Sequence, residues 1–370
     1  MKVLLTWLQE FAPLEGTSEE ISDQLSGLGL TVEGMTYIGG DLDGVVVAKV
    51  LDLRAHPDAD RIQLVDVDSG DGEPLQICCG AFNMKIGDLV PLATLGTIMN
   101  NGMEIAKRKM RGQWSNGMLC AASEIGLGVD SEGIMLLDSS FEVGAPLKEA
   151  LGIQEDVLFD LEVNPNRPDA MSIAGVARDL AALQGKKFSL PTPKEKERGK
   201  SVNERLSVEI LAPELCGRFV ARILNDIEVG PSPSWVSNRL VALGMRPINN
   251  VVDASNYVML ELGQPSHTYD LDRVHGSGFK VRKAQEGEKI TTLDGIERSL
   301  ASSDGVVADA ENVAIGIAGV MGGASTEIGQ DTKTIALEMA WWDPISISAT
   351  ARRLGLRSEA SSRFERGADP

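Results

Sequence analysis

The chain has 370 residues, of which 43% are hydrophobic, with a formal net charge of −19, four cysteines and three histidines. This length predicts two to three domains, and no apolar stretch is long enough to cross a membrane. The amino terminus lacks a cleavable signal pattern and the cysteines fit a reducing compartment, so we expect a cytoplasmic protein without membrane contacts. Adjacent Cys78 and Cys79, isolated Cys120 and Cys216, and the few histidines argue against a metal site.

The first residues predict a strand, Val3 to Leu5, followed by a helix. Thr17 and Glu20 have the spacing of a capping box, Thr-x-x-Glu. The apolar residues that follow recur at helical spacing, and a glycine supplies the left-handed stop. These residues are Ile21, Leu25, Leu28 and Gly29. Because this element is too small to bury a core, it needs a partner elsewhere in the chain.

Residues 56–128 contain short segments with the pattern of strands, followed by a cluster of basic residues at 107–111. A strand over 62–67 is followed by a turn at 69–72 and by a β segment interrupted by glycines. Short strands separated by glycine turns favour a small barrel, and basic side chains on a barrel rim suit a phosphate backbone. The four cations of the cluster are Lys107, Arg108, Lys109 and Arg111.

The opening of this segment, HPDADR, and its close, SNGMLCAASEIGL, resemble the tRNA-binding OB-fold module of several tRNA synthetases and of free-standing tRNA-binding proteins. The resemblance implies an OB barrel over 40–149. The net charge of −19 opposes RNA binding, because an acidic protein repels phosphate at long range. We therefore expect weak, salt-sensitive contact with tRNA through residues 107–111, with a solvated hairpin as the alternative.

A candidate partner for the first helix lies beyond the barrel. Leu158 to Val163 predicts a strand, and a helical apolar stripe follows and ends at Gly185. The stripe consists of Ile173, Val176, Leu180 and Leu183. We therefore expect a small split α/β domain, made of 1–39 and 150–190, into which the barrel is inserted.

Residues 191–201 contain prolines and cations but no apolar residue, and predict a solvated linker. In the remaining residues, 202–370, the segment LSVEI predicts a strand. A helix follows over Trp235 to Leu243, with Ser234 as its N-cap and Gly244 as its terminator. Asp343 and Pro344 predict the start of the last helix, as cap and first-turn proline, and we expect this single basic helix to end in RSEASSRFERGADP.

Four long motifs follow the barrel: NPNRPDAMSIAGVARDLAAL, RPINNVVDASNYVMLELGQPSHTYD, GIAGVMGG and LRSEASSRFERGADP. With the barrel, they resemble the bacterial phenylalanyl-tRNA synthetase beta subunit along the whole chain. The resemblance implies an α+β multidomain protein whose residues 202–370 form an α/β editing module. It also implies an α2β2 enzyme in which the alpha subunit charges tRNA(Phe), using ATP and Mg2+. We expect further domains beyond Pro370 and no cofactor in this chain.

The resemblance assigns two residues to the editing reaction. Glu338, in ALEMA, matches the glutamate that reads the phenol of a mischarged tyrosine, and a carboxylate accepts such a hydrogen bond strongly. His267, in QPSHTYD, matches the editing-site histidine, which orients water or contacts the terminal ribose. Without the resemblance, a half-exposed strand glutamate and a loop histidine bonded to backbone are the better interpretations.

Other residues match positions that line the editing site. Arg246 and Asn256 match polar contacts, Gly319 allows close approach of the backbone, and Ala360 matches a small wall residue with Ser358 nearby. The glycine run lacks the Lys-Ser/Thr of a P-loop. No nucleophile pattern and no metal constellation is evident, so we expect direct attack by water on the ester. A tRNA-binding scaffold and a free-standing deacylase remain alternatives.

Overall fold

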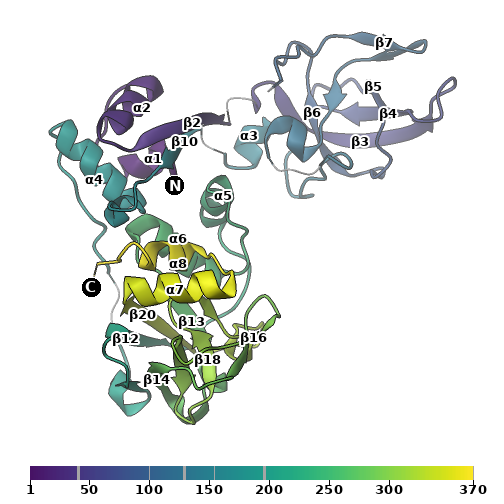
Figure 1. Ribbon diagram of the computed structural model, residues 1–370. Coiled ribbons are helices and arrows are strands. Elements are labelled where there is room, and N and C mark those ends of the chain that lie inside the picture. Colours follow the sequence, from purple (N-terminus) through teal and green to yellow (C-terminus); the bar gives the residue numbers. More distant parts are fainter. Residues whose placement is uncertain (40–41, 100, 128–130, 154, 195–196, 370) are drawn as a thin grey trace. The chain divides into compact units, whose positions relative to one another are not determined.

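The computed structural model describes residues 1–370 except 40–41, 100, 128–130, 154, 195–196 and 370. Positions 40–41, 100 and 128–130 of the expected barrel, 154 of the expected split domain and 195–196 of the linker therefore lie outside the described residues. The α+β chain divides into two compact units, one of Met1–Met35 with Phe159–Pro370 and one of Thr36–Leu158 (Figure 1). None of the described helices is long and apolar enough to span a membrane.

A three-stranded sheet of order β1-β10-β2 brings the start of the chain beside residues near 160. Its strands are β1 (Lys2–Leu4), β10 (Asp156–Glu162) and β2 (Thr31–Ile38), and the helices beside it are α1 (Leu5–Gln9), α2 (Ser18–Gly27) and α4 (Ile173–Leu183). The capping box of α2 is confirmed: Thr17 Oγ1 accepts from the Glu20 amide at 3.3 Å, and the Glu20 carboxylate accepts from the Thr17 amide at 2.9 Å. Three members of the predicted stripe, Ile173, Val176 and Leu180, are buried, together with Ala177 and Ala181, whereas the fourth, Leu183, is 52% exposed.

The unit Thr36–Leu158 is built on an antiparallel five-stranded sheet of order β5-β4-β3-β6-β9, nearly closed into a barrel. The elements of this unit are β3 (Val45–Ala55), β4 (Gln63–Asp68), β5 (Leu75–Cys79), β6 (Leu89–Ala93), β7 (Arg108–Met110), β8 (Gln113–Ser115), β9 (Met118–Leu119), η2 (Ala122–Ile125) and α3 (Leu147–Ala150). The register of β3 on β4 shifts between Val50 and Asp52, as at a β-bulge, which bends a strand. The bent sheet encloses a core that includes Val50, Val65 and Leu92.

Two sheets form the body of the region after residue 200, and they share one core. The five-stranded sheet has the order β11-β14-β17-β18-β19, the three-stranded sheet the order β12-β20-β13, and β15-β16 is a separate hairpin. The strands are β11 (Ser207–Ile210), β12 (Cys216–Leu224), β13 (Ser266–Asp270), β14 (Gly278–Lys283), β15 (Lys289–Thr291), β16 (Glu297–Ser299), β17 (Gly305–Asp309), β18 (Ala314–Ile317), β19 (Met321–Gly322) and β20 (Ile335–Trp342). Val281 and Val306 of the larger sheet are buried in the same core as Ala336 of β20.

Four helices accompany these sheets: α5 (Ser234–Ala242), α6 (Asn250–Leu262), α7 (Pro344–Leu354) and α8 (Glu359–Phe364). The short 3₁₀ helices of this unit are η3 (Pro168–Ala170), η4 (Val202–Glu204), η5 (Leu271–Arg273), η6 (His275–Ser277) and η7 (Ala324–Thr326). Helices α7 and α8 pack against each other, and α7 also contacts β17 of the larger sheet (Figure 1). Pro233, not Ser234, is the N-cap of α5, so that prediction is wrong by one residue.

The expected last helix begins as predicted but is divided in two. Asp343 Oδ2 accepts from the Ser346 amide at 2.8 Å, which caps α7. Gly355 has a φ of +64° and ends that helix, because this left-handed conformation favours glycine. Ser358 then caps α8, where its Oγ accepts from the Ser361 amide at 3.0 Å. The single helix expected from the sequence is therefore wrong.

Candidate functional site

Two neighbouring strands bring His267 and Glu338 together. In the antiparallel pair β13–β20, His267 lies directly opposite Glu338. Directly opposite side chains project from the same face of a sheet and lie close together. Tyr269 follows two residues after His267 on β13 and so points to the same face.

The carboxylate of Glu338 is buried, with 7% exposure, and it accepts a hydrogen bond from the hydroxyl of Tyr269 at 2.5 Å. Burial raises the pKa of Glu338 to about 7, and the hydrogen bond from Tyr269 opposes that rise. Burial and the nearby carboxylate together hold the pKa of Tyr269 well above its usual range, so the phenol stays protonated and acts as the donor. The side chain of Glu338 is therefore a buried carboxylate that binds a phenol hydroxyl.

The ring of His267 lies edge-on to that of Tyr269, with 4.5 Å between the ring centroids. It also lies against Gly322, where a Cβ atom would come within 2.3 Å of His267 Cε1 and 2.4 Å of Nε2. Only glycine leaves room for the imidazole at that position. Burial lowers the pKa of His267 to about 4, so the ring is neutral at neutral pH.

A glycine turn forms the opposite wall. Gly319 lies between β18 and β19 with a φ of +65°, and a Cβ there would lie 2.7 Å from Ile347 Cδ1 and 2.9 Å from Trp342 Cδ1. Both the backbone conformation and the close packing therefore require glycine. Side chains and backbone from β13, β18, β20 and α8 enclose a cleft of about 80 Å³. It is lined by Pro265, Ser266, His267, Tyr269, Val307, Gly316, Ile317, Ala318, Gly319, Val320, Met321, Gly322, Glu338, Trp342, Ala360 and Phe364.

The cleft thus brings together four of the expected site residues: His267, Glu338, Gly319 and Ala360. The other three, Arg246, Asn256 and Ser358, are not among the described residues that line it. Ser358 donates its Oγ–H to the carbonyl of Val320 at 2.8 Å, so it holds the wall from behind. Arg246 is exposed after the end of α5, and Asn256 is half-buried on α6. Among the lining residues that sequence reasoning missed, Tyr269 is the one that bonds Glu338; its spacing from His267, two residues along one strand, was the available signal.

The four expected tRNA contacts lie together on the hairpin β7–β8. All four side chains are exposed, and Lys107 Nζ and Lys109 Nζ lie 5.4 and 5.7 Å from the ring centroid of Trp114. Arg111 occupies the turn with a φ of +43° and donates to the carbonyl of Asp58 at 3.2 Å. Asp58 belongs to HPDADR, so the structure joins the opening motif to the basic cluster. An exposed tryptophan between cations is suited to stacking on a base.

Comparisons with known proteins first define a class. Residues 45–146 match the family model of a tRNA binding domain, and residues 215–370 match the model of the B3/4 domain. The first covers the barrel with its basic hairpin, and the second covers the sheets and helices that build the cleft. The chain therefore combines a domain of a tRNA-binding family with a B3/4 domain.

Comparisons over the whole of this chain identify the family. The chain is 46% identical over 370 residues to the phenylalanine–tRNA ligase beta subunit of Anaeromyxobacter dehalogenans, and 45% identical over 369 residues to that of Geobacter sulfurreducens. Each match covers 100% of this chain and 46% of the relative. A solved amino-terminal fragment of the phenylalanyl-tRNA synthetase beta subunit from Pyrococcus horikoshii is 17% identical with a TM-score of 0.30, covering 55% of this chain and 62% of the fragment. The chain belongs to the phenylalanine–tRNA ligase beta subunit family and spans about half the length of the curated relatives it matches.

Proposed function

We propose that this chain binds tRNA(Phe) through its barrel and hydrolyses mischarged tyrosyl-tRNA(Phe) in the cleft of Glu338. The observation that carries the proposal is the hydrogen bond between Glu338 and a phenol hydroxyl, that of Tyr269, at 2.5 Å. A buried carboxylate that already binds one phenol is chemically suited to recognise another. Because the chain belongs to a phenylalanine–tRNA ligase family, the phenol that we propose as substrate is that of tyrosine mischarged onto tRNA(Phe).

The chemistry of discrimination supports a second, hydrolytic site. Tyrosine differs from phenylalanine by one hydroxyl, and an apolar synthetic pocket rejects an added hydroxyl by only about a hundredfold. A site that hydrogen-bonds the hydroxyl rejects the analogue without it by about 10⁴ to 10⁵. Phenylalanine would leave the buried carboxylate of Glu338 without its partner, which costs free energy. Glu338 therefore selects the wrong amino acid for removal.

His267 is placed to assist at the ester. Its neutral ring has one nitrogen able to accept a hydrogen bond, from a water molecule or from the terminal ribose. Hydrolysis of an aminoacyl ester requires a positioned water and stabilisation of the developing oxyanion. We assign His267 to positioning and leave the attack to water, in keeping with the sequence expectation of no protein nucleophile.

The cleft must widen to accept substrate. Its volume is about 80 Å³, whereas a protein cavity that holds benzene measures roughly 150 Å³. A phenol ring therefore requires that some lining side chain moves.

The rest of the reaction belongs to the complete enzyme. We propose that this chain is part of an α2β2 ligase in the cytoplasm, whose alpha subunit supplies ATP- and Mg2+-dependent charging of tRNA(Phe). The glycine run around Gly319 lacks P-loop residues, so we assign no nucleotide triphosphate to it.

Deacylation by the purified chain tests the editing function. Tyrosyl-tRNA(Phe) and phenylalanyl-tRNA(Phe) are incubated separately with the chain, and loss of the aminoacyl ester is followed over the background rate. We expect faster hydrolysis of the tyrosyl ester. Binding of tRNA without any hydrolysis above background would instead support a tRNA-binding scaffold.

A further inference from the structure

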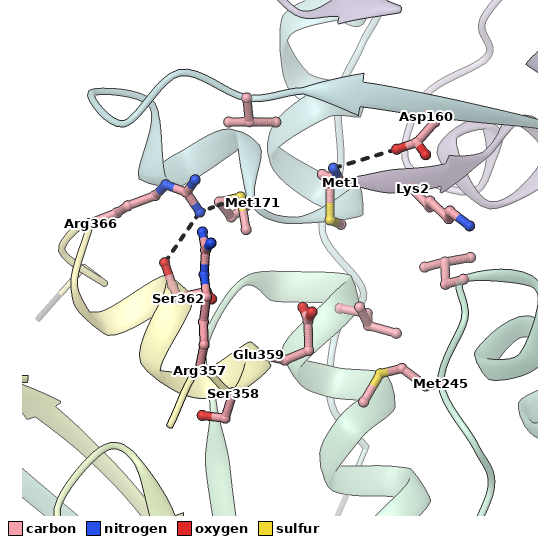
Figure 2. A pocket seen from close by; sticks show the side chains of 13 residues that line it. Met1, Lys2, Asp160, Met171, Met245, Arg357, Ser358, Glu359, Ser362 and Arg366 are labelled. Atoms are coloured by element: carbon pink, nitrogen blue, oxygen red, sulfur yellow. Dashed lines mark hydrogen bonds and ion pairs between the residues drawn. The ribbon is translucent and has the colours of Figure 1, made fainter. Parts of the chain in front are cut away.

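A second and larger cavity, of about 440 Å³, lies beside α8 (Figure 2). The two cavities share this helix as a wall. Ser358, Ser362 and Arg366 follow one another at intervals of four residues and line the larger cavity, whereas Ala360 and Phe364 line the cleft of Glu338. Residues spaced by four lie on one face of a helix, so α8 turns opposite faces to the two cavities.

Helix α8 is firmly held between them. The guanidinium of Arg363 is buried, with 1% exposure, and its Nε donates to the carbonyl of Met171 at 3.1 Å. Its Nη1 donates to the carboxylate of Glu359 at 2.7 Å. The bond to Met171 fixes the helix to a segment that also lines the larger cavity, and the bond to Glu359, within the helix, orients the guanidinium. Because α8 is held in place, the two cavities on its opposite sides keep a fixed position relative to each other.

The larger cavity carries uncompensated positive charge. Figure 2 shows the guanidinium groups of Arg357 and Arg366 pointing toward one another at its edge. Within the described part of the chain, neither Arg357 nor Lys2 makes a side-chain hydrogen bond or ion pair. By contrast, Glu359 is paired with Arg363, and Asp160 lies 3.8 Å from the ammonium of Met1. Two like charges that face each other favour an anion between them.

We propose that this cavity binds the phosphodiester backbone of a single-stranded RNA 3′ end whose terminal aminoacyl group enters the cleft on the other side of α8. The inference rests on the proposed editing function for the origin of the RNA end. The cleft of about 80 Å³ has no room for nucleotides, whereas 440 Å³ lies within the range of ligand pockets, about 300 to 1,000 Å³. In a chain of net charge −19, a cationic cavity counteracts the long-range repulsion of phosphate.

Methionine methyl resonances test this site without any hydrolysis. Met171 and Met245 line the proposed RNA cavity, Met321 lines the cleft, and Met110 lies on the basic hairpin of the barrel. The chain with ¹³C-methyl methionine is titrated with the uncharged trinucleotide CCA, and separately with adenosine as a ligand without phosphate. The trinucleotide should shift Met171 and Met245, and adenosine should leave both unchanged.

Two matched variants complete the test. Arg357→Gln should weaken the affinity measured at Met171 and Met245 on the order of tenfold, because a charge-assisted contact is lost, and should lower the log–log salt slope by about 0.7 per lost phosphate contact. Arg352→Gln removes an exposed cation of α7 that lines neither cavity, and should leave affinity and slope unchanged. Shifts confined to Met110, no shift at all, or equal affinity of wild type and Arg357→Gln would each overturn the proposal. Shifts at Met171 and Met245 in a chain that hydrolyses neither ester would contradict the editing function but not the RNA site.

Discussion

The hydroxyl of Tyr269 lies 2.5 Å from Oε2 of Glu338, and both groups are buried. The contact joins two strands, β13 and β20, that neighbour each other in one sheet. It fixes one carboxylate oxygen and leaves the other for a second donor. The same contact also moderates the charge of Glu338, because a hydrogen bond to the ionised form lowers a carboxyl pKa. Tyr269 is thus a positioning residue for the group that is proposed to read the substrate.

Removing only the Tyr269 hydroxyl tests that role. In Tyr269→Phe we expect the preference for tyrosyl over phenylalanyl ester to fall by about tenfold, since the carboxylate loses its orientation. The pKa of Glu338 should rise further, so the pH at which selectivity develops should move upward. Tyr257→Phe removes a phenol hydroxyl that bonds Arg239 outside the cleft and should change neither quantity. Unchanged selectivity and an unchanged pH profile in Tyr269→Phe would remove Tyr269 from this role.

The raised pKa of Glu338 predicts a pH dependence of folding stability. In the unfolded chain this carboxyl ionises near pH 4.5, whereas in the folded chain it ionises near 7. The folded state holds the proton more tightly, so the contribution to stability is full below about pH 4.5 and is lost as the pH rises to about 7. Glu338→Gln cannot ionise and should lack this loss. Denaturant unfolding at pH 5 and pH 8 should therefore show a larger decline for wild type than for the variant; equal declines would contradict the assigned pKa.

Protonation of His267 should not change the hydrolysis rate near neutral pH. Because burial lowers the pKa of His267 to about 4, its ring stays neutral from pH 5 upward. We expect His267 to contribute no inflection near pH 6.5 to the rate for the tyrosyl ester, whereas an inflection near pH 7 from Glu338 should remain in His267→Ala. An inflection near pH 6.5 that disappears in His267→Ala would show that the ring titrates at its ordinary value.

The wall residue Ala360 predicts a steric block. Ala360→Trp adds a large side chain to a cleft of about 80 Å³, so hydrolysis of the tyrosyl ester should fall to background. Ala349→Trp places the same side chain at an exposed position of α7 and should keep wild-type activity. Both variants should unfold at similar denaturant concentrations. Full activity in a folded Ala360→Trp chain would mean that the substrate uses another site.

The basic hairpin predicts the salt dependence of tRNA binding. Neutralising Lys107, Arg108, Lys109 and Arg111 together should weaken binding and flatten the log–log salt slope by about 0.7 to 0.9 for each lost phosphate contact. Neutralising Lys49 and Lys85, two exposed barrel cations outside the hairpin, serves as the control and should have a smaller effect. A slope unchanged by the fourfold substitution would identify the hairpin as solvated surface.

Several local signals were predicted correctly from the sequence, whereas the pairing of distant strands was not predicted. The caps at Thr17 and Asp343 depend on residues three positions apart, and both were predicted. The end of α7 at Gly355 is a local signal that was missed, whereas the exposure of Leu183 depends on tertiary packing. The contact of Tyr269 with Glu338 depends on the pairing of strands that lie far apart in the chain. Resemblance placed Glu338 in the site, but only the register of β13 on β20 revealed its partner.

The ratio of tyrosyl to phenylalanyl ester hydrolysis, in wild type and in two variants, tests the central claim most directly. Glu338→Ala should bring the ratio close to one, because the group that distinguishes the amino acids is gone. His267→Ala should slow both esters and keep the ratio, because its proposed place is near the ester. Equal hydrolysis of both esters by the wild-type chain, or a full preference that survives in Glu338→Ala, would contradict the account.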